Sequence, residues 1–291
     1  MAVSTNGTDE SADPVTLAVH GRTVAEYVVW PDVDPRYSPR PYLHPVRTLA
    51  GVPVTDTLPE DHRWHLGVSV TMQDVAGTNL WGGRTYVRDA GYTWRDDHGR
   101  ITHDAWLDRG PAGFRQRLRW CDPTGATLLT EERVVAAGAV PGRSDAWCLD
   151  IAYELSAGAD REISLGSPAT NGRPGGAGYG GFFWRLAPGS PFAFTSAADG
   201  EDAVNGSTEP WVAVNGEGSA GEPYSVIFTG LSPGDHWFVR TGIYPGVCVA
   251  LAFEEPLSVP AGQTVRRRHR VLVVDGRSTR DGVVSTLASF G

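Results

Sequence analysis

The chain has 291 residues with 25 basic and 34 acidic side chains, and its formal net charge of −9 argues against a nucleic acid partner, because a polyanion would be repelled. All 25 basic residues are arginines. Without lysine there is no Schiff base to a carbonyl substrate and no Walker-type phosphate loop, which excludes lysine-dependent aldolases, transaminases and P-loop hydrolases.

Glycine and proline punctuate the chain at short intervals, with 36 and 21 copies. This spacing favours short strands joined by turns. We predict an all-β fold, an antiparallel β-sandwich with few short helices, forming a single domain over residues 15–291 after a disordered polar tail over residues 1–14. The three cysteines are widely spaced and odd in number, so we expect buried, reduced thiols.

No apolar run is long enough to cross a bilayer, and the polar N-terminus lacks the pattern of a signal peptide. We therefore expect a soluble, cytoplasmic protein without a membrane partner.

In chain order, residues 15–30 predict a hairpin that turns at His20 and Gly21. Apolar and polar residues alternate from Leu66 to Gln73, which predicts a half-buried strand. Turn-forming residues at 97–99 and 122–125 predict two further hairpins. Between these, residues 114–120 alternate apolar side chains with arginines, as expected of a strand with one buried face.

Residues 166–181, GSPATNGRPGGAGYGG, precede a strand-like FFWRL segment and lack a Gly-Lys pair, so a phosphate cradle is not predicted. Two interpretations stay open: a mobile loop over a site, offering Asn171, Arg173 and Tyr179, or a plain surface connection. Further strands are expected over residues 237–240, 247–253 and 264–274, and a helix only after Ser278.

The main functional signal lies between Arg40 and Gly67, in RPYLHPVRTLAGVPVTDTLPEDHRWHLG. It holds His44, His62 and His65, and imidazole both moves protons near neutral pH and binds transition metals. Residues three apart on a strand face opposite sides, so the second and third histidines share a site only if residues 59–64 form a turn. The Pro-Glu-Asp start suits the first turn of a short helix.

We expect a soluble enzyme that acts on a small, polar, carbohydrate-derived substrate by histidine acid–base chemistry, as an isomerase, lyase or hydrolase. The predicted catalytic residues are His44, His62, His65 and Glu132. The predicted substrate contacts are Arg40, Tyr42, Asp61, Arg63, Tyr179 and Arg240. Adjacent glutamates such as Glu131 and Glu132 point to opposite faces of a strand and cannot form the carboxylate pair of a glycosidase.

Two alternatives remain at this stage. One is a metal-dependent oxygenase or hydrolase, with a divalent metal held by His44, His62, His65 and Asp61, although the main prediction involves no cofactor. The other is a non-catalytic carbohydrate-binding or assembly module, in which the histidines cap turns and are fully hydrogen-bonded. The sequence also leaves a homo-oligomer open.

The segments RPYLHPV, TDTLPEDHRWHLGV and DVAGTNLWGG resemble a bacterial family labelled PmoA-like, or methane oxygenase PmoA, and the resemblance extends along most of the chain. Asp61, His62, His65 and Gly67 match its DHxHHRG motif, whereas Trp64 replaces a histidine and Leu66 an arginine. The resemblance implies a soluble β-sandwich, similar to the galactose-mutarotase-like supersandwiches, and a role in sugar catabolism.

Overall fold

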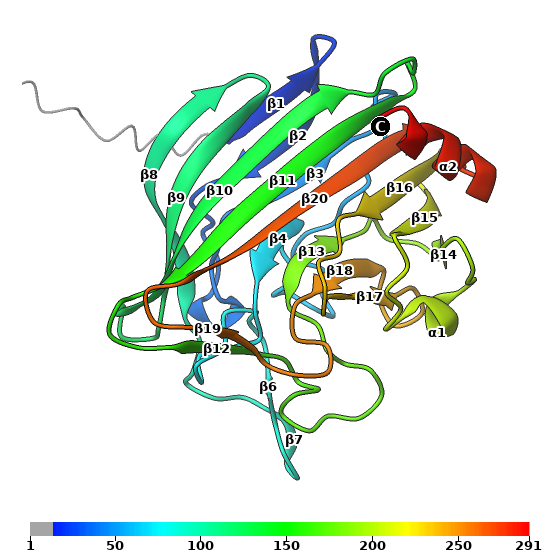
Figure 1. The fold of residues 1–291 in the computed structure, drawn as a ribbon. Helices are drawn as coiled ribbons and strands as arrows, with labels where there is room; N and C mark the ends of the chain where they lie inside the picture. The colour runs from blue at the N-terminus through cyan, green and yellow to red at the C-terminus, as the bar shows by residue number, and fades with distance from the viewer. Residues whose placement is uncertain (1–13, 291) are drawn as a thin grey trace, which may run out of the picture.

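The computed structural model describes residues 14–290, in which two large antiparallel sheets pack face to face (Figure 1). One sheet has seven strands and the other has eight, and all pairs of strands described are antiparallel. The prediction of an antiparallel β-sandwich with few short helices is confirmed. The predicted disordered tail, residues 1–14, lies outside the described residues apart from Pro14.

The seven-stranded sheet has the order β1 (Val15–Val19), β2 (Arg22–Val28), β3 (Tyr42–Val46), β4 (Val68–Thr71), β13 (Gly181–Arg185), β18 (Gly246–Ala250) and β17 (His236–Arg240). The eight-stranded sheet has the order β14 (Phe192–Phe194), β15 (Trp211–Glu217), β16 (Pro223–Thr229), β20 (Thr264–Asp275), β11 (Ala146–Ala157), β10 (Thr127–Ala139), β9 (Gly113–Cys121) and β8 (Arg100–Gly110).

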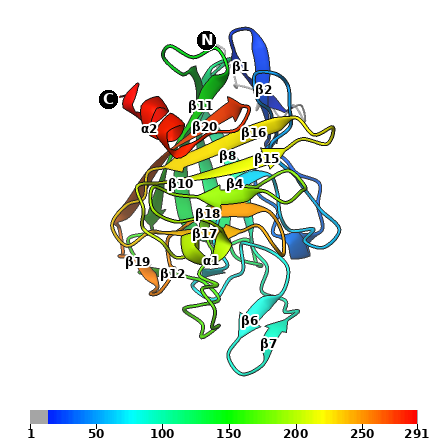
Figure 2. The same ribbon diagram turned by 90° about the vertical axis from the view of Figure 1, so that its right-hand side faces the viewer.

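Smaller elements lie at the ends of these sheets. They are the three-stranded sheet β19 (Leu257–Val259), β12 (Ile163–Gly166) and β5 (Asp74–Val75), the hairpin β6 (Thr85–Val87) and β7 (Gly91–Thr93), the helices α1 (Glu201–Val204) and α2 (Arg280–Ala288), and the 3-10 turn η1 (Pro35–Tyr37). Figures 1 and 2 show the β6–β7 hairpin projecting beyond the edge of the sandwich. Among the described residues, no helix combines the length and apolar character needed to cross a membrane.

The local predictions hold where neighbouring residues alone decide the structure. The first hairpin turns at His20 and Gly21, both with positive φ, and residues 122–125 join β9 to β10. On β9 the apolar side chains are buried and the arginines exposed, as predicted. All three cysteines are buried free thiols. The helix expected after Ser278 is α2.

Two predictions about strands are wrong. Residues 97–99 do not turn a hairpin, because β7 pairs with β6 and β8 pairs with β9. Instead His98 bridges to Asn79, and its ring nitrogen lies 2.6 Å from the carbonyl oxygen of Gly83. The strand predicted from Leu66 is β4, and it is buried on both faces because loops cover the outer face of its sheet.

The alternation of side chains on the central strands creates both the core and the site. Phe182 and Trp184 on β13 point into the core between the sheets, where they belong to the same apolar cluster as Val271 and Val273 of β20. Phe183 lies between them in sequence and therefore points to the outer face. There it packs with Phe238 of β17 in a second aromatic cluster, and this cluster forms the base of the main cavity.

Candidate functional site

A cavity of about 500 Å³ lies where loops cover the outer face of the seven-stranded sheet. Four stretches of chain form it: the turn before β4, the residues around the β6–β7 hairpin, the loop between β12 and β13, and β17 with the turn that follows it. The lining residues are Asp61, His62, Trp64, His65, Trp81, Arg84, Tyr92, Trp94, Arg173, Tyr179, Phe238, Arg240, Ile243 and Tyr244.

The turn required for two histidines to share a site is present. The backbone N–H of His62 donates to the carbonyl of Pro59 over 3.1 Å, and that of His65 donates to the carbonyl of His62 over 2.8 Å. The chain makes turns here and not the short helix that we expected. As a result the two imidazole rings stack, with 4.7 Å between their centroids and 25° between their planes.

His62 is oriented by the preceding carboxylate. Its Nδ1 lies 2.8 Å from Oδ2 of Asp61, and both side chains are partly exposed in the cavity. Burial raises the pKa of Asp61, but the hydrogen bond and charge of His62, together with the charge of Arg185, outweigh it and hold that pKa below its ordinary value. Asp61 therefore stays ionised and engages Nδ1, which leaves Nε2 as the basic nitrogen of the neutral ring.

His65 is in a different environment, because it is only 1% exposed. Burial lowers its pKa well below the ordinary value, and the positive charges of His62, Arg185 and Arg40 lower it further. The ring is therefore neutral at physiological pH. Its Nδ1 is buried without a hydrogen-bond partner among the described residues. A buried polar atom of this kind is one that a bound ligand can satisfy.

Aromatic side chains surround the two histidines. The Tyr244 ring centroid lies 4.7 Å from the centroids of both His62 and His65, and Trp81 packs edge-on against His65 at 5.8 Å. The hydroxyls of Tyr92 and Tyr179 lie 3.0 Å apart. Burial raises the pKa of each of these three phenols, so they stay protonated and can donate hydrogen bonds.

The glycine pair after Trp81 brings two loops together. Gly82 and Gly83 have positive φ, and a Cβ added to Gly83 would lie 2.4 Å from the ring of Trp64. Trp64 thus packs directly on this backbone and forms a wall of the cavity. Trp94 meets it edge-on with 6.4 Å between ring centroids, and 47% of Trp94 is exposed. Trp94 offers an open aromatic face at the rim.

The charge balance of the lining is positive. The charged residues of the lining are three arginines, Arg84, Arg173 and Arg240, and one carboxylate, that of Asp61. Arg84 has no ion pair within residues 14–290, and Arg173 lies over the ring of Tyr92, to whose hydroxyl it donates. Only Arg240 approaches a carboxylate, with Nε 3.6 Å from Oε1 of Glu201. The lining therefore favours a ligand that carries a negative charge.

The predicted metal set does not assemble. Across the described part of the chain, no three His, Cys, Asp or Glu side chains are grouped so that they could hold a metal ion. His44 is the residue that fails to join, because its Nδ1 lies 3.0 Å from the hydroxyl of Thr55 and it does not line the cavity. Among the described residues these donors are therefore not grouped as a metal centre, and His44 lies apart from the other two predicted catalytic histidines.

The cavity lining also lacks four other predicted residues, which are Glu132, Arg63, Tyr42 and Arg40. Glu132 is on the outer face of β10, in an ion pair with Arg115, because adjacent strand residues alternate between faces. Arg63 is exposed on the solvent side of the turn. Tyr42 is buried on β3.

Arg40 is fully buried and acts as a scaffold. Its guanidinium donates to the carbonyls of Trp64 and Trp81 over 2.9 and 3.0 Å, so it holds two walls of the cavity in place. Burial, together with the charge of Arg133, lowers its pKa to about 9.

The structure also brings in residues that the sequence did not single out. Trp81, Trp94 and Tyr244 reach the cavity from segments far apart in the chain. Of these three, only Trp81 had a signal in the local sequence, because it precedes the Gly-Gly pair of the segment DVAGTNLWGG. The glycine-rich loop contributes Arg173 and Tyr179 to this cavity, which supports the interpretation of residues 166–181 as a loop beside a site.

The model of a family of unknown function, DUF6807, matches residues 14–288, so the chain belongs to that family. The match says nothing about a PmoA-like family, and that resemblance stays a prediction. No curated protein matches the chain.

Solved structures that resemble the chain include heparan sulfate lyase HepC from Pedobacter heparinus, with a TM-score of 0.37 and 10% identity over 88% of this chain and 34% of that one. A mutant of the same lyase has a TM-score of 0.38 and 10% identity, with 93% of this chain and 36% of the other covered. The chain thus spans about a third of the length of these structures. A likeness this distant does not identify a ligand.

Proposed function

We propose that this member of a family of unknown function is an enzyme that acts on a small, polar, carbohydrate-derived substrate by histidine acid–base chemistry. The observation that carries the proposal is the Asp61–His62 pair stacked on a neutral, buried His65 inside an aromatic cavity. A carboxylate-oriented imidazole next to a second imidazole with an unpartnered nitrogen is an arrangement suited to moving a proton.

The two histidines have different roles in this proposal. His62 accepts or donates the proton at Nε2, while Asp61 holds the ring and stabilises the imidazolium that forms. His65 stays neutral and hydrogen-bonds a substrate oxygen through its unpartnered Nδ1. The two rings differ in environment, since burial lowers the pKa of His65, whereas the side chain of His62 is partly exposed in the cavity.

The cavity wall supports a substrate with both a sugar-like ring and an anionic group. Exposed Trp94 and the neighbouring tyrosines provide faces on which the apolar side of a sugar ring stacks. Arg84 and Arg173 have no carboxylate partner among the described residues and are suited to binding a substrate carboxylate. A sugar acid fits both requirements.

Within the described lining, Asp61 is the single carboxylate, and it is engaged by His62. Glycoside hydrolysis generally uses two carboxylates on either side of the scissile bond. Isomerisation or elimination beside a carboxylate needs a base and positive charge near the developing anion, and both are present here. We therefore favour an isomerase or lyase over a hydrolase.

The alternative of a non-catalytic carbohydrate-binding module requires that the histidines be structural and fully hydrogen-bonded. The unpartnered Nδ1 of His65 and the partial exposure of His62 in the cavity favour the enzyme. The cytoplasmic location stays a prediction.

The proposal can be tested by incubating the protein with D-glucuronate, D-galacturonate, D-gluconate and their neutral parent sugars in D₂O. Proton abstraction from carbon is detected by NMR as deuterium incorporation or as a new product. We expect turnover of an acidic sugar, and we expect His62→Ala to lower it by about 10²- to 10⁴-fold, the usual contribution of a general acid or base. Arg173→Gln should chiefly weaken binding.

The matched control is His20→Asn, which changes a histidine in the exposed turn of the first hairpin. It should leave turnover unchanged, since asparagine tolerates the positive φ of that position. Equal turnover by wild type and His62→Ala would disprove the proposed role of His62. Binding of an acidic sugar with no exchange or product under any condition would instead support the non-catalytic module.

A further inference from the structure

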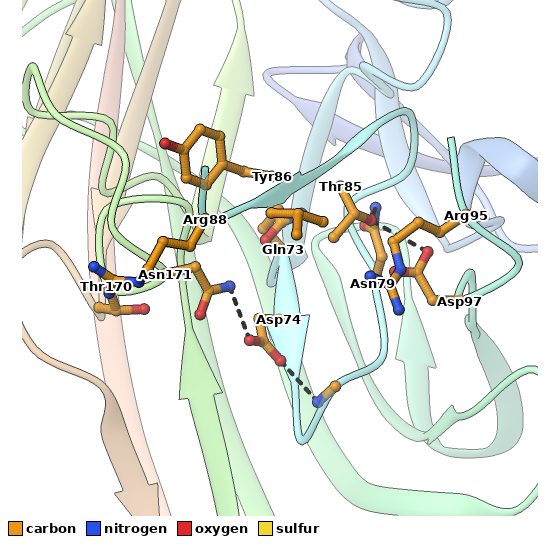
Figure 3. Close-up of a pocket in the computed structure, with 12 residues that line it drawn as sticks. Gln73, Asp74, Asn79, Thr85, Tyr86, Arg88, Arg95, Asp97, Thr170 and Asn171 are labelled. Carbon is orange, nitrogen blue, oxygen red and sulfur yellow. Dashed lines mark hydrogen bonds and ion pairs between the residues drawn. The ribbon is translucent and has the colours of Figure 1, made fainter. Parts of the chain in front are cut away.

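A second pocket, of about 380 Å³, lies beside the β6–β7 hairpin (Figure 3). Its lining comes from the residues after β4, from β6 and the arginine that follows it, from Arg95 and Asp97 after β7, and from Thr170 and Asn171 of the glycine-rich loop. No lining residue is shared with the cavity that holds His62 and His65, called the histidine cavity below, although the hairpin and the loop contribute to both. The two sites are neighbours with separate walls.

Gln73 is the central feature of this pocket. It lines the pocket, is only 1% exposed, and neither its Oε1 nor its Nε2 has a hydrogen-bond partner among the described residues. Figure 3 shows its side chain between Arg88 and Asn171 on one side and Thr85 and Arg95 on the other. A buried amide with both polar atoms unsatisfied is costly, so its retention points to a ligand that donates to one atom and accepts from the other.

The groups around Gln73 are anchored and carry both signs of charge. Asp74 accepts from Nδ2 of Asn171 over 3.0 Å and from the backbone N–H of Gly77 over 2.8 Å. Asp97 accepts from the hydroxyl of Thr85 over 3.1 Å. These bonds hold the carboxylates rigidly in place while leaving lone pairs for a ligand.

Two guanidinium groups balance the two carboxylates. Nε of Arg95 lies 3.4 Å from Oδ2 of Asp97. Arg88 lies against Gly172, and a Cβ added to this glycine would be 2.7 Å from Cζ of Arg88. Arg88 has no ion pair within residues 14–290. The pocket is therefore near neutral overall and holds donors and acceptors on all sides, unlike the arginine-rich histidine cavity.

We propose that this pocket is a binding site for a neutral, polyhydroxylated ligand of about one sugar ring. Each hydroxyl both donates and accepts, so two adjacent hydroxyls satisfy Oε1 and Nε2 of Gln73 together. An anion would be repelled by the carboxylates of Asp74 and Asp97. A cation would be repelled by the guanidinium groups of Arg88 and Arg95. The volume lies in the usual range for small-molecule sites. The inference does not depend on the reaction proposed for the histidine cavity.

The test is binding of D-glucose, D-galactose and myo-inositol to the full chain at millimolar concentrations, followed by NMR of the side-chain amide of Gln73. We expect at least one of these compounds to bind and to shift that amide resonance. Gln73→Met keeps the side-chain length and removes both polar atoms, and it should weaken binding about tenfold or more, the effect of losing one to two good hydrogen bonds.

Asn171→Ala is a second variant, in a part-buried position that the fold tolerates more readily, and it should also weaken binding. His20→Asn, in the exposed turn of the first hairpin, is the matched control and should leave the affinity unchanged. The inference is overturned if none of the three compounds binds the wild type, if Gln73→Met and Asn171→Ala both bind as tightly as the wild type, or if His62→Ala alone abolishes binding. Stronger binding of sulfate or glycine than of the three compounds would overturn it as well.

Discussion

His269 on β20 should make the protein lose stability as the pH falls below neutrality. It is 0% exposed and stacks on Phe182 with 5.2 Å between ring centroids. Its Nδ1 lies 3.0 Å from the carbonyl of Gly230 and its Nε2 lies 3.3 Å from the hydroxyl of Tyr153. The neutral ring donates at Nδ1 and accepts at Nε2, so both nitrogens are satisfied without a charge.

Burial lowers the pKa of His269 from 6.5 to about 4, and the hydrogen bond to Gly230 offsets only part of this. Between these two values the unfolded chain binds a proton that the folded chain does not. Stability is therefore unaffected above about pH 6.5 and falls as the pH drops toward the folded pKa. With about 1.4 kcal/mol for each pKa unit, the loss amounts to about 2 kcal/mol at about pH 5 and about 3 kcal/mol when complete.

The assay is urea unfolding at a series of pH values from about 7 to about 5, for the wild type and for His269→Gln. Glutamine can donate to Gly230 and accept from Tyr153, and it does not titrate. Other buried histidines contribute equally to both proteins and cancel in the difference. We expect the wild type to lose about 2 kcal/mol more than the variant over this range. Parallel curves for the two proteins would show that the folded protein protonates His269 as readily as the unfolded chain does, which would refute the reasoning.

Further predictions concern buried polar groups and thiols. Glu131→Gln should cost about 3–5 kcal/mol in urea unfolding because it leaves the buried Arg133 charge without a counterion, whereas Glu132→Gln, on the exposed side of the same strand, should change stability by less than about 1 kcal/mol. Gln116→Met removes the partner of a buried tyrosine hydroxyl and should cost about 1–3 kcal/mol, while Gln73→Met, which removes unpartnered atoms, should leave stability equal or higher. The three buried cysteines should resist a thiol reagent in the native state and all react after unfolding; rapid native labelling of any one would contradict its burial.

The sequence determined the features that depend on neighbouring residues. Positive-φ residues such as His20 and Gly21 specify a tight turn, and the alternation of apolar side chains with arginines specifies which face of β9 is buried. It also marked the segment that holds His62 and His65, and it stated the condition under which they meet. These are short-range consequences of backbone geometry.

Tertiary structure decided which distant residues share a cavity. His44 lies in the same histidine-rich segment and was predicted to join, yet its place on β3 directs it to Thr55. Trp94 and Tyr244 had no local signal and line the cavity only because loops from different parts of the chain cover one face of the sheet. Local pattern does not encode the pairing of strands far apart in sequence, since that pairing depends on the packing of the whole core.

The second pocket, around Gln73, shows the same difference between what sequence and tertiary structure determine. In the sequence, Gln73 was simply the last polar position of an alternating strand, and nothing near it indicated an unpartnered amide. Its isolation results from the closure of the β6–β7 hairpin and the glycine-rich loop over the end of β4. Sequence thus determined the strands and turns, and only the assembled sheets and loops decided which polar atoms were left for a ligand, because burial and hydrogen bonding are properties of the packed structure.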